Sequence, residues 1–308
     1  MSGNYKSFIY ERIFRLFFSI RKKIENTRIS EWLRIAFFKW LEKRYGDTLY
    51  YEAEIHEKKI LFSTEDYYSK GWFFPRYKDG KIHEEAVTLF LIGELKSSRC
   101  FVDVGTNLGW YSILASVFMK AGTVYGFEMD EMNFALAKKN SELNRSENLY
   151  LFHAAVSDTC GQISYIRNSL NPNAEFRIAS DLKKTKDENI ISIESIALDD
   201  FFKDKEIQPD IVKIDVEGAE IKVLRGMTRI LENSSPKLFV EIHPFTMVDY
   251  HSSAEQVIAL LISHGYKVFE IENMRGHGVD ISLKELNSTS HFYYNAMLYA
   301  YNPGLAKT

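Results

Sequence analysis

Short apolar runs alternate with helical patterns over the last two thirds of the chain, and this alternation is the strongest constraint on its fold. The apolar runs have the length and composition of buried strands, and they lie at residues 100–105, 123–128, 148–156, 209–215, 237–243, 266–271 and 291–300. Helical patterns occupy most of the intervals, at residues 109–122, 130–144, 219–233 and 252–265. The alternation predicts an α/β domain with a mostly parallel sheet and helices on both faces. Ligands of such sheets bind beyond the carboxyl ends of the strands.

Two local patterns refine this prediction. Residues 161–198 contain short strand-like pieces and polar loop instead of a regular helix, and a short helix follows them. The helix predicted at residues 252–265 begins with a capping-box pattern, Ser252 to Glu255, and ends at Gly265.

Charge and cysteine content limit the class of protein. The 308-residue chain has a formal net charge of −3, which argues against general binding to nucleic acid. The two cysteines, Cys100 and Cys160, lack the spacing of a metal site, so we expect a reducing compartment without disulfides. No apolar run approaches the roughly 18 residues of a membrane span. Charges interrupt the N-terminal region, so no signal peptide is expected, and a cytoplasmic location is predicted.

The N-terminal segment differs from the rest in charge. Its first fifty residues hold 11 Lys and Arg against 5 Asp and Glu, so this part carries +6 and the remainder −9. Apolar residues at helical spacing in the run FIYERIFRLFFSIRKKI predict a basic amphipathic helix, and residues 30–46 predict a second one. We expect residues 1–60 to be a helical extension and residues 61–308 to be the main domain. The segment 1–45 can lie on the inner face of an anionic membrane, or it can pack on its own domain or on a second subunit, which is the commoner use of an apolar stripe.

A glycine turn follows the first strand of the alternation, in the run FVDVGTNLGWYS. A dinucleotide fingerprint starting at Gly105 would need glycines where the chain has Asn107 and Trp110, so nicotinamide cofactors are disfavoured. Asp103 can accept hydrogen bonds from an ammonium group, and N–H groups at the helix start can hold a carboxylate. An amino acid has both groups, as does the methionine part of S-adenosylmethionine.

The second strand ends in an acid, Glu128, 23 residues after Gly105. An acid at that position can accept hydrogen bonds from both ribose hydroxyls of an adenosine cofactor. The alternative is that Asp103 and Glu128 are ordinary loop acids, which their positions at matching strand ends disfavour.

Five motifs together resemble the FkbM-type methyltransferases, a branch of the class I S-adenosylmethionine-dependent enzymes. They are FVDVGTNLGWYS, VYGFEMD, HAAVSD, SIALDDFF and IVKIDVEGAEIKVLRGM. The resemblance covers about residues 80–300. It implies that residues 61–308 form a Rossmann-like seven-stranded sheet with the last strand antiparallel, and that the reaction is O-methylation of a hydroxyl on a sugar, glycan or polyketide.

The resemblance also implies roles for individual residues. Asp103, Gly105, Asn107 and Gly109 would hold the methionine end of the cofactor, and Glu128 the ribose. Ser157 and Asp158 would lie near the adenine. The acceptor is not fixed by the resemblance, and residues 1–60 lie outside it.

Three acids follow the strand IVKID, namely Asp215, Glu217 and Glu220. Asp215 ends this strand, and Glu241 and His243 end the next one, so all three are expected at the same edge of the sheet. A hydroxyl becomes a good nucleophile when a base or a metal ion draws its proton away.

The strand-end residues permit two mechanisms. Asp215 and Glu241, with His243, suit a hard cation such as Mg²⁺, although such ions usually take several oxygen ligands. Without a metal, His243 is the base and a carboxylate orients it. Glu217 is expected to touch acceptor or cofactor. Glu220 is expected only to offset the dipole of the following helix.

Two rival functions remain open. One is another enzyme on the same fold, such as a nicotinamide dehydrogenase, which Asn107 and Trp110 oppose. The other is a catalytically inactive protein that binds an adenosine cofactor. Calorimetry with S-adenosylmethionine and with NAD distinguishes a dehydrogenase from a methyltransferase. Turnover of the cofactor with hydroxylated acceptors distinguishes an enzyme from an inactive binding protein.

Overall fold

A computed structural model describes residues 48–66, 69–77, 80–119, 121–167, 176–178, 190–278 and 280–304. The chain divides into two units, residues 1–51 with 64–76, and residues 52–63 with 77–308. The helices predicted within residues 1–45 lie outside the described residues. In the first unit, π-helix η1 (Ser69–Phe73) is followed by α3 (Phe74–Tyr77), and the Phe73 ring packs edge-on against Tyr51 with centroids 5.7 Å apart.

The predicted end of the helical extension is wrong, because residues 50–60 are not helical. They belong to a two-stranded sheet of β1 (Tyr50–Ile55) and β2 (Lys58–Ser63). In the second unit, β2 is fixed to α6 (Glu131–Leu143) and the residue that follows it. The backbone N–H of Leu61 donates to Asn144 Oδ1 at 2.9 Å, and Asn144 Nδ2 donates back to the Leu61 carbonyl at 2.7 Å.

The main sheet of the second unit has eight strands in the order β13-β12-β14-β11-β10-β3-β4-β5. Their bounds are β3 Cys100–Val104, β4 Thr123–Glu128, β5 Leu149–His153, β10 Ile211–Ile214, β11 Lys237–Ile242, β12 Lys267–Ile271, β13 Leu283–Glu285 and β14 Ala296–Tyr301. The strands β3, β4, β5, β10 and β11 pair in parallel, and β14 is antiparallel to both β11 and β12. The predicted Rossmann-like arrangement with an antiparallel last strand is confirmed, and β13 adds a short eighth strand at the edge.

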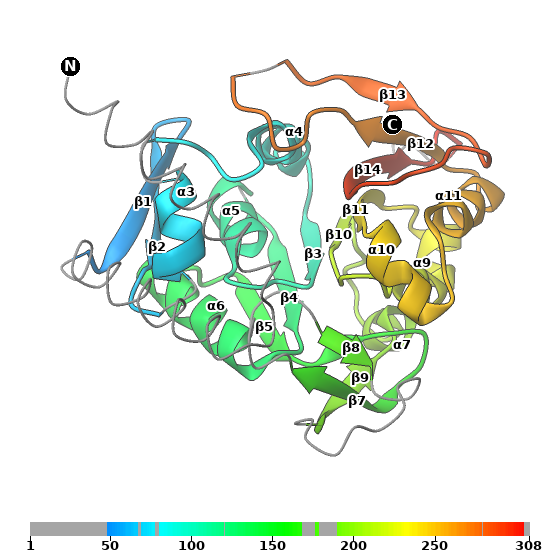
Figure 1. Ribbon diagram of the computed structural model, residues 1–308, viewed down its shortest axis with the longest axis horizontal. Helices are drawn as coiled ribbons and strands as arrows, with labels where there is room; N and C mark the ends of the chain where they lie inside the picture. The colour runs from blue at the N-terminus through cyan, green and yellow to red at the C-terminus, as the bar shows by residue number, and fades with distance from the viewer. Residues whose placement is uncertain are drawn as a thin grey trace, which may run out of the picture. The chain divides into compact units, whose positions relative to one another are not determined.

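Helices cover both faces of this sheet (Figure 1). The helices α4 (Glu85–Leu95), α5 (Trp110–Phe118) and α6 lie on one side. The other side carries α7 (Leu198–Phe202), α8 (Glu220–Arg225), α9 (Thr228–Asn233) and α11 (Ala254–Ser263), whose apolar residues form one buried cluster with the strands. Between β11 and α11 run the short helices α10 (Pro244–Met247) and η3 (Val248–Tyr250).

The irregular stretch predicted at residues 161–198 forms a second, four-stranded sheet in the order β6-β9-β7-β8. Its strands are β6 Ala155–Val156, β7 Gly161–Arg167, β8 Phe176–Ile178 and β9 Ile190–Ile196. The short strand β6 directly follows β5, so this sheet extends from the edge of the main sheet.

The helix predicted at residues 219–233 is interrupted, giving α8 and α9. A Cβ on Gly226 would lie 2.0 Å from the Ser157 carbonyl oxygen, so only glycine permits this close approach. The Asp199 carboxylate accepts hydrogen bonds from the backbone N–H groups of Arg229 and Ile230 in the first turn of α9. An acid from elsewhere in the chain therefore caps a new helix that the local pattern did not reveal.

The predicted capping box of α11 is shifted by one residue. Ser253, not Ser252, is the N-cap, and it exchanges hydrogen bonds with Gln256. Ser252 is buried and donates instead to the Met247 carbonyl oxygen at 3.2 Å.

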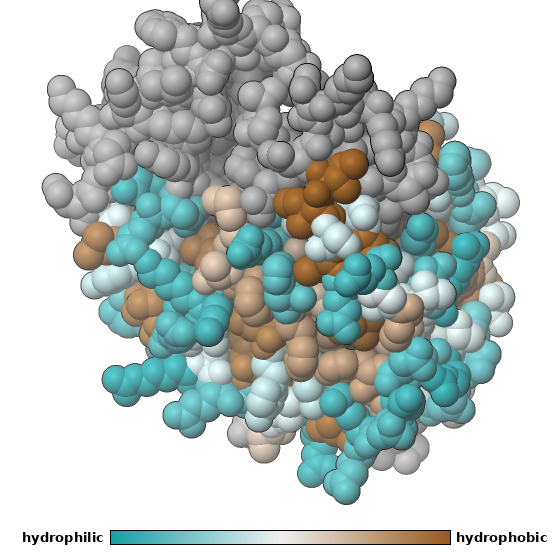
Figure 2. Space-filling model, turned by 90° about the horizontal axis from the view of Figure 1, so that it is seen from below, coloured by the Kyte–Doolittle hydropathy of each residue, from teal (hydrophilic) through white to brown (hydrophobic). Residues whose placement is uncertain are grey.

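Large apolar side chains are exposed at scattered positions, among them Met132, Tyr150 and Ile190. Figure 2 shows one face of the molecule, on which hydrophobic residues occur between strongly hydrophilic ones. Such scattered exposure is normal for globular proteins and indicates no site by itself. Among the described helices, none combines the length and the apolar character that crossing a bilayer requires.

Candidate active site

The glycine turn after β3 passes directly against the end of β10. The φ of Gly105 is +84°, and a Cβ there would lie 1.8 Å from the Asp215 carbonyl oxygen. Two N–H groups of the turn, those of Gly105 and Thr106, donate to the Phe127 carbonyl oxygen at 2.9 and 3.0 Å. Glycine is thus required where the turn and the acidic segment meet. Gly109 follows as the N-cap of α5.

A pocket with a cavity volume of about 100 Å³ opens beside this turn. Six of the predicted site residues line it, namely Gly105, Asn107, Glu128, Ser157, Asp215 and Glu217. Apolar residues such as Val156, Ile163 and Tyr250 complete the wall. Asp103, Gly109 and Asp158 are not among its lining residues.

Glu128 is a buried carboxylate at the floor of this pocket. Its Oε2 accepts a hydrogen bond from the Asn107 N–H at 2.7 Å, and its Oε1 accepts one from the Asp130 N–H at 2.8 Å. Burial raises the pKa of Glu128 to about 7, although both hydrogen bonds oppose the rise. The carboxylate therefore has a fixed orientation and a charge that depends on pH near neutrality.

Asp103 is fully buried and contacts protein groups. Its Oδ2 accepts from the Ser112 hydroxyl at 2.6 Å, whereas Oδ1 has no hydrogen-bond partner within the described part of the chain. Burial raises the pKa of Asp103, and the charge of Lys213, its partner across β3 and β10, opposes this rise.

Lys213 is a functional candidate that sequence reasoning missed. Its ammonium group is buried, lies 3.1 Å from Asp215 Oδ2 and sits 4.6 Å from the centre of the Tyr111 ring. Burial alone would lower the pKa of Lys213, but Asp215 and Asp103 raise it above its usual value. The only signal in the sequence was a lysine inside the apolar run IVKI. A lysine in a buried strand is almost always paired with a charged group, so this position indicated a partner.

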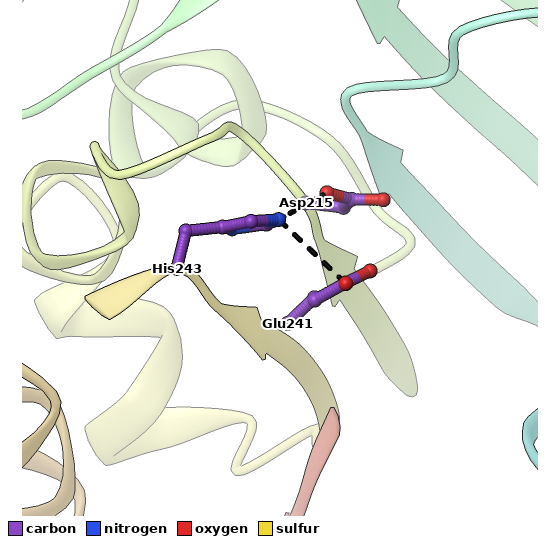
Figure 3. A group of neighbouring side chains, drawn as sticks. All are labelled: Asp215, Glu241 and His243. Carbon is purple, nitrogen blue, oxygen red and sulfur yellow. Dashed lines mark ion pairs between the residues drawn. The ribbon is translucent and has the colours of Figure 1, made fainter. Parts of the chain in front are cut away.

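Asp215, Glu241 and His243 converge at the carboxyl ends of β10 and β11 (Figure 3). His243 Nε2 lies 3.7 Å from Asp215 Oδ1 and 3.6 Å from Glu241 Oε1. One ligand atom from each of the three residues can be chosen so that all lie within 4.8 Å of one another. The residues predicted to meet at this edge are therefore side by side.

Burial and charge set the protonation of the two carboxyls differently. Burial raises the pKa of Asp215, but Lys213 and His243 outweigh it and leave the pKa below its usual value. The pKa of Glu241 is raised well above the usual range, first by burial and then by the charge of Asp215. Asp215 is therefore ionised at neutral pH.

Glu220 holds the other side of the His243 ring, which sequence reasoning also missed. It is fully buried, and its Oε1 lies 2.8 Å from both His243 Nδ1 and the Gly218 N–H. The expectation that Glu220 only offsets a helix dipole is therefore incomplete. Burial would lower the pKa of His243, but the hydrogen bond to Glu220 and the charges of Glu217 and Asp215 raise it to about 10. Glu217 Oε2 lies 3.5 Å from Nε2.

Arg275 reaches the same cluster from the connection after β12. Its guanidinium lies 3.2 Å from Glu241 Oε1 and 3.9 Å from Glu84 Oε1, and the Glu84 carboxylate accepts from the Tyr111 hydroxyl at 2.6 Å. The contact of Arg275 with Glu84 joins residues 191 positions apart, so no local pattern could have shown it.

The residues fit an adenosine cofactor with a ribose at Glu128. Glu128→Ala should weaken binding of S-adenosylhomocysteine by about 1–3 kcal/mol, the usual cost of losing hydrogen bonds to a charged group. Because the carboxylate gains a proton below its pKa of about 7, wild-type affinity should also fall between about pH 8 and about pH 6. Calorimetry at the two pH values measures both effects. Glu128→Gln is the control that should remove this part of the pH dependence, and an unchanged affinity in Glu128→Ala would remove Glu128 from the site.

Residues 103–268 match the family model of the methyltransferase FkbM domain. The chain belongs to this family. It is 28% identical over 161 residues to the hexuronic acid methyltransferase AglP of Haloferax volcanii, covering 52% of this chain and 62% of the relative. It is 31% identical over 127 residues to the ribosomal protein L11 methyltransferase of Caldanaerobacter subterraneus, covering 41% of each.

A solved structure was also matched, a methyltransferase FkbM from Methylobacillus flagellatus KT. The identity is 15% and the TM-score 0.43, with 88% of this chain and 60% of the other covered. The chain thus spans less than two thirds of the length of each of these three proteins.

Proposed function

We propose that this FkbM-family chain transfers a methyl group from S-adenosylmethionine to a hydroxyl of a sugar or glycan. One observation carries the proposal. A single pocket is lined at one place by Glu128 and the glycine turn, and at another by Asp215. Asp215 belongs to the acidic cluster, by which we mean Asp215, Glu241 and His243. The proposed ribose contact and an ionised carboxylate would therefore share one cavity. The sugar part is supported by the Haloferax relative, which is a hexuronic acid methyltransferase.

The cofactor would be held by groups that the pocket presents. Glu128 would accept hydrogen bonds from the ribose, and the turn from Gly105 to Asn107 would face the methionine end. Val156 and Ile163 offer an apolar wall for the adenine, next to Ser157. When bound, S-adenosylmethionine supplies the electrophilic sulfonium methyl group.

Asp215 would act on the acceptor. Lys213 keeps its carboxylate ionised, so the carboxylate can accept a hydrogen bond from the acceptor hydroxyl. While the acceptor oxygen takes the methyl group that S-adenosylmethionine would supply, leaving S-adenosylhomocysteine, the hydroxyl proton would pass to Asp215. General-base assistance of this kind contributes about 10²–10⁴ in rate.

His243 is not available as the base in this arrangement, because its pKa of about 10 keeps the imidazole protonated at neutral pH. As a cation it would instead balance the charges of Asp215 and Glu217 around the reacting atoms. Glu220 would orient the ring through Nδ1.

A divalent cation is the alternative way to activate the hydroxyl. Asp215, Glu241 and His243 offer two carboxylates and one imidazole at metal-binding separation, and a cation would displace the proton from His243. Mg²⁺ usually keeps several waters, so three protein ligands are enough. Thorough chelation distinguishes the metal mechanism from the general-base mechanism. Activity that survives removal of metal ions would mean that Asp215 acts as a base.

Transfer of a labelled methyl group into a cell extract tests the proposed function directly. The protein is incubated with methyl-labelled S-adenosylmethionine and an extract of its native cell, which is then separated into glycan, lipid, protein and RNA fractions. The proposal expects label in the glycan fraction. Label confined to protein or RNA contradicts it, and cofactor binding without any transfer supports the inactive binding protein instead.

For residues 1–45 we propose contact with an anionic membrane surface, because a +6 charge accompanies a Phe-rich apolar stripe in the sequence. Deleting residues 1–45 should abolish salt-sensitive binding to phosphatidylserine vesicles and leave cofactor affinity unchanged. Vesicle flotation at low and high salt measures this. If the intact chain ignores such vesicles, the segment instead packs on its own domain or on a second subunit.

A further inference from the structure

A second pocket lies at the same edge of the main sheet as the cofactor pocket. Because β11 and β12 are both antiparallel to β14, their carboxyl ends point the same way. The pocket is formed by the end of β12, the start of β14 and the connection after β12. Its cavity volume is about 520 Å³, which is enough for a small ligand.

The acidic cluster stands between the two pockets. Arg275 lines the second pocket, and its guanidinium lies 3.2 Å from Glu241. Glu241 is 3.6 Å from His243, and His243 is 3.7 Å from Asp215, which lines the cofactor pocket. A ligand that contacts Arg275 in the second pocket would therefore be linked to Asp215 through Glu241 and His243.

The walls of the second pocket carry hydrogen-bond donors and acceptors, and they include both cationic and anionic side chains. Glu270 is buried, and its carboxylate accepts from the Tyr294 hydroxyl at 2.8 Å and lies 3.9 Å from Lys284. Asn295 and Arg275 add further hydrogen-bonding groups. Sugar hydroxyls both donate and accept, so they match such a mixed lining. A polyanion would meet carboxylates, and a lipid chain would meet too few apolar groups.

The wall that carries Arg275 is fixed at a second point. Glu85 of α4 accepts a hydrogen bond from the Gly278 N–H at 3.0 Å and lies 3.1 Å from His277 Nδ1. Figure 1 shows the connection between β12 and β13 running toward α4. The backbone that follows Arg275 is thus tied to α4, and the guanidinium itself contacts Glu241 at 3.2 Å.

We propose that the second pocket is an acceptor subsite, that it binds a pyranose ring of the acceptor through its hydroxyls, and that Arg275 orients the acceptor toward Asp215. This assignment rests on the proposed function, because it presumes a sugar acceptor. Arg275 is a specificity-determining residue in this account, and Glu270 with Lys284 supplies further hydroxyl contacts.

Saturation-transfer NMR tests the subsite with the intact chain, S-adenosylhomocysteine and two probes, methyl glucopyranoside and methyl glucopyranosiduronate. Wild type should bind at least one glycoside, and Arg275→Gln should weaken that binding about tenfold through loss of a charged hydrogen bond. Lys284→Gln should weaken it by a smaller factor. Lys267→Gln is the matched control, because Lys267 is similarly exposed and has its own glutamate at 3.9 Å, yet does not line the pocket.

The outcomes separate the subsite from the function. If Arg275→Gln and Lys284→Gln bind glycoside and transfer methyl as wild type does, the subsite is wrong and the proposed function stands. If neither glycoside binds although extract glycan is labelled, the single-ring subsite is likewise overturned. If no glycan accepts label at all, the proposed function fails and the subsite with it.

Discussion

Asp215→Asn should lower the rate of methyl transfer by about 10²–10⁴-fold while leaving cofactor affinity within a few fold. The amide keeps the shape of the side chain but removes the negative charge that attracts the hydroxyl proton or a cation. Single-turnover transfer from labelled S-adenosylmethionine to an accepted glycan measures the first effect, and calorimetry with S-adenosylhomocysteine measures the second.

Folding must be checked in this variant, because Asp215 pairs with buried Lys213. A thermal melt with and without S-adenosylhomocysteine shows whether the pocket survives. Asp204→Asn is the matched control, since Asp204 is exposed and lines neither of the two pockets described. A fully active Asp215→Asn would eliminate both the base and the metal version and would make Glu217 the next residue to test.

Gly105→Ala should destabilise the protein by about 3–5 kcal/mol and abolish cofactor binding. The new Cβ would lie 1.8 Å from the Asp215 carbonyl oxygen, which is backbone and cannot rotate away. The left-handed φ of +84° adds strain for any residue with a side chain. Denaturant unfolding and calorimetry measure the two losses.

Gly93→Ala is the control for this substitution. Gly93 lies inside α4, and a Cβ there would have no atom within 4 Å. The control should be stabilised by about 0.5–1 kcal/mol, because alanine is the better helix former. If Gly105→Ala is as stable as the control and binds cofactor normally, the turn does not pack against the end of β10.

The sequence was sufficient for features that depend on periodicity along the chain. Apolar runs placed the strands, and the position of Glu128 at the end of β4 followed from them. Asp215, Glu241 and His243 were expected together because parallel strands bring their carboxyl ends to one edge.

Contacts between distant segments were beyond that reasoning. The helix pattern at 219–233 was continuous, but Asp199 and the packing of Gly226 against Ser157 divide it. Glu220 looked like a helix-dipole residue, since nothing local showed His243 at 2.8 Å. Arg275 lies 34 residues after Glu241, in a connection with no periodic pattern. Polar interactions of this kind depend on tertiary geometry, which the hydrophobic pattern does not encode.

The position of the transferred methyl group tests the central claim most directly. S-adenosylmethionine with a deuterated methyl group is incubated with the protein and a glycan acceptor, and the product is analysed by tandem mass spectrometry and NMR. We expect a base-stable methyl ether on a ring hydroxyl oxygen, because the proposed role of Asp215 is to draw away a hydroxyl proton. Label found only on a carboxyl oxygen or on a nitrogen would contradict it, since an ionised carboxylate needs no base and a nitrogen acceptor is a different class of substrate.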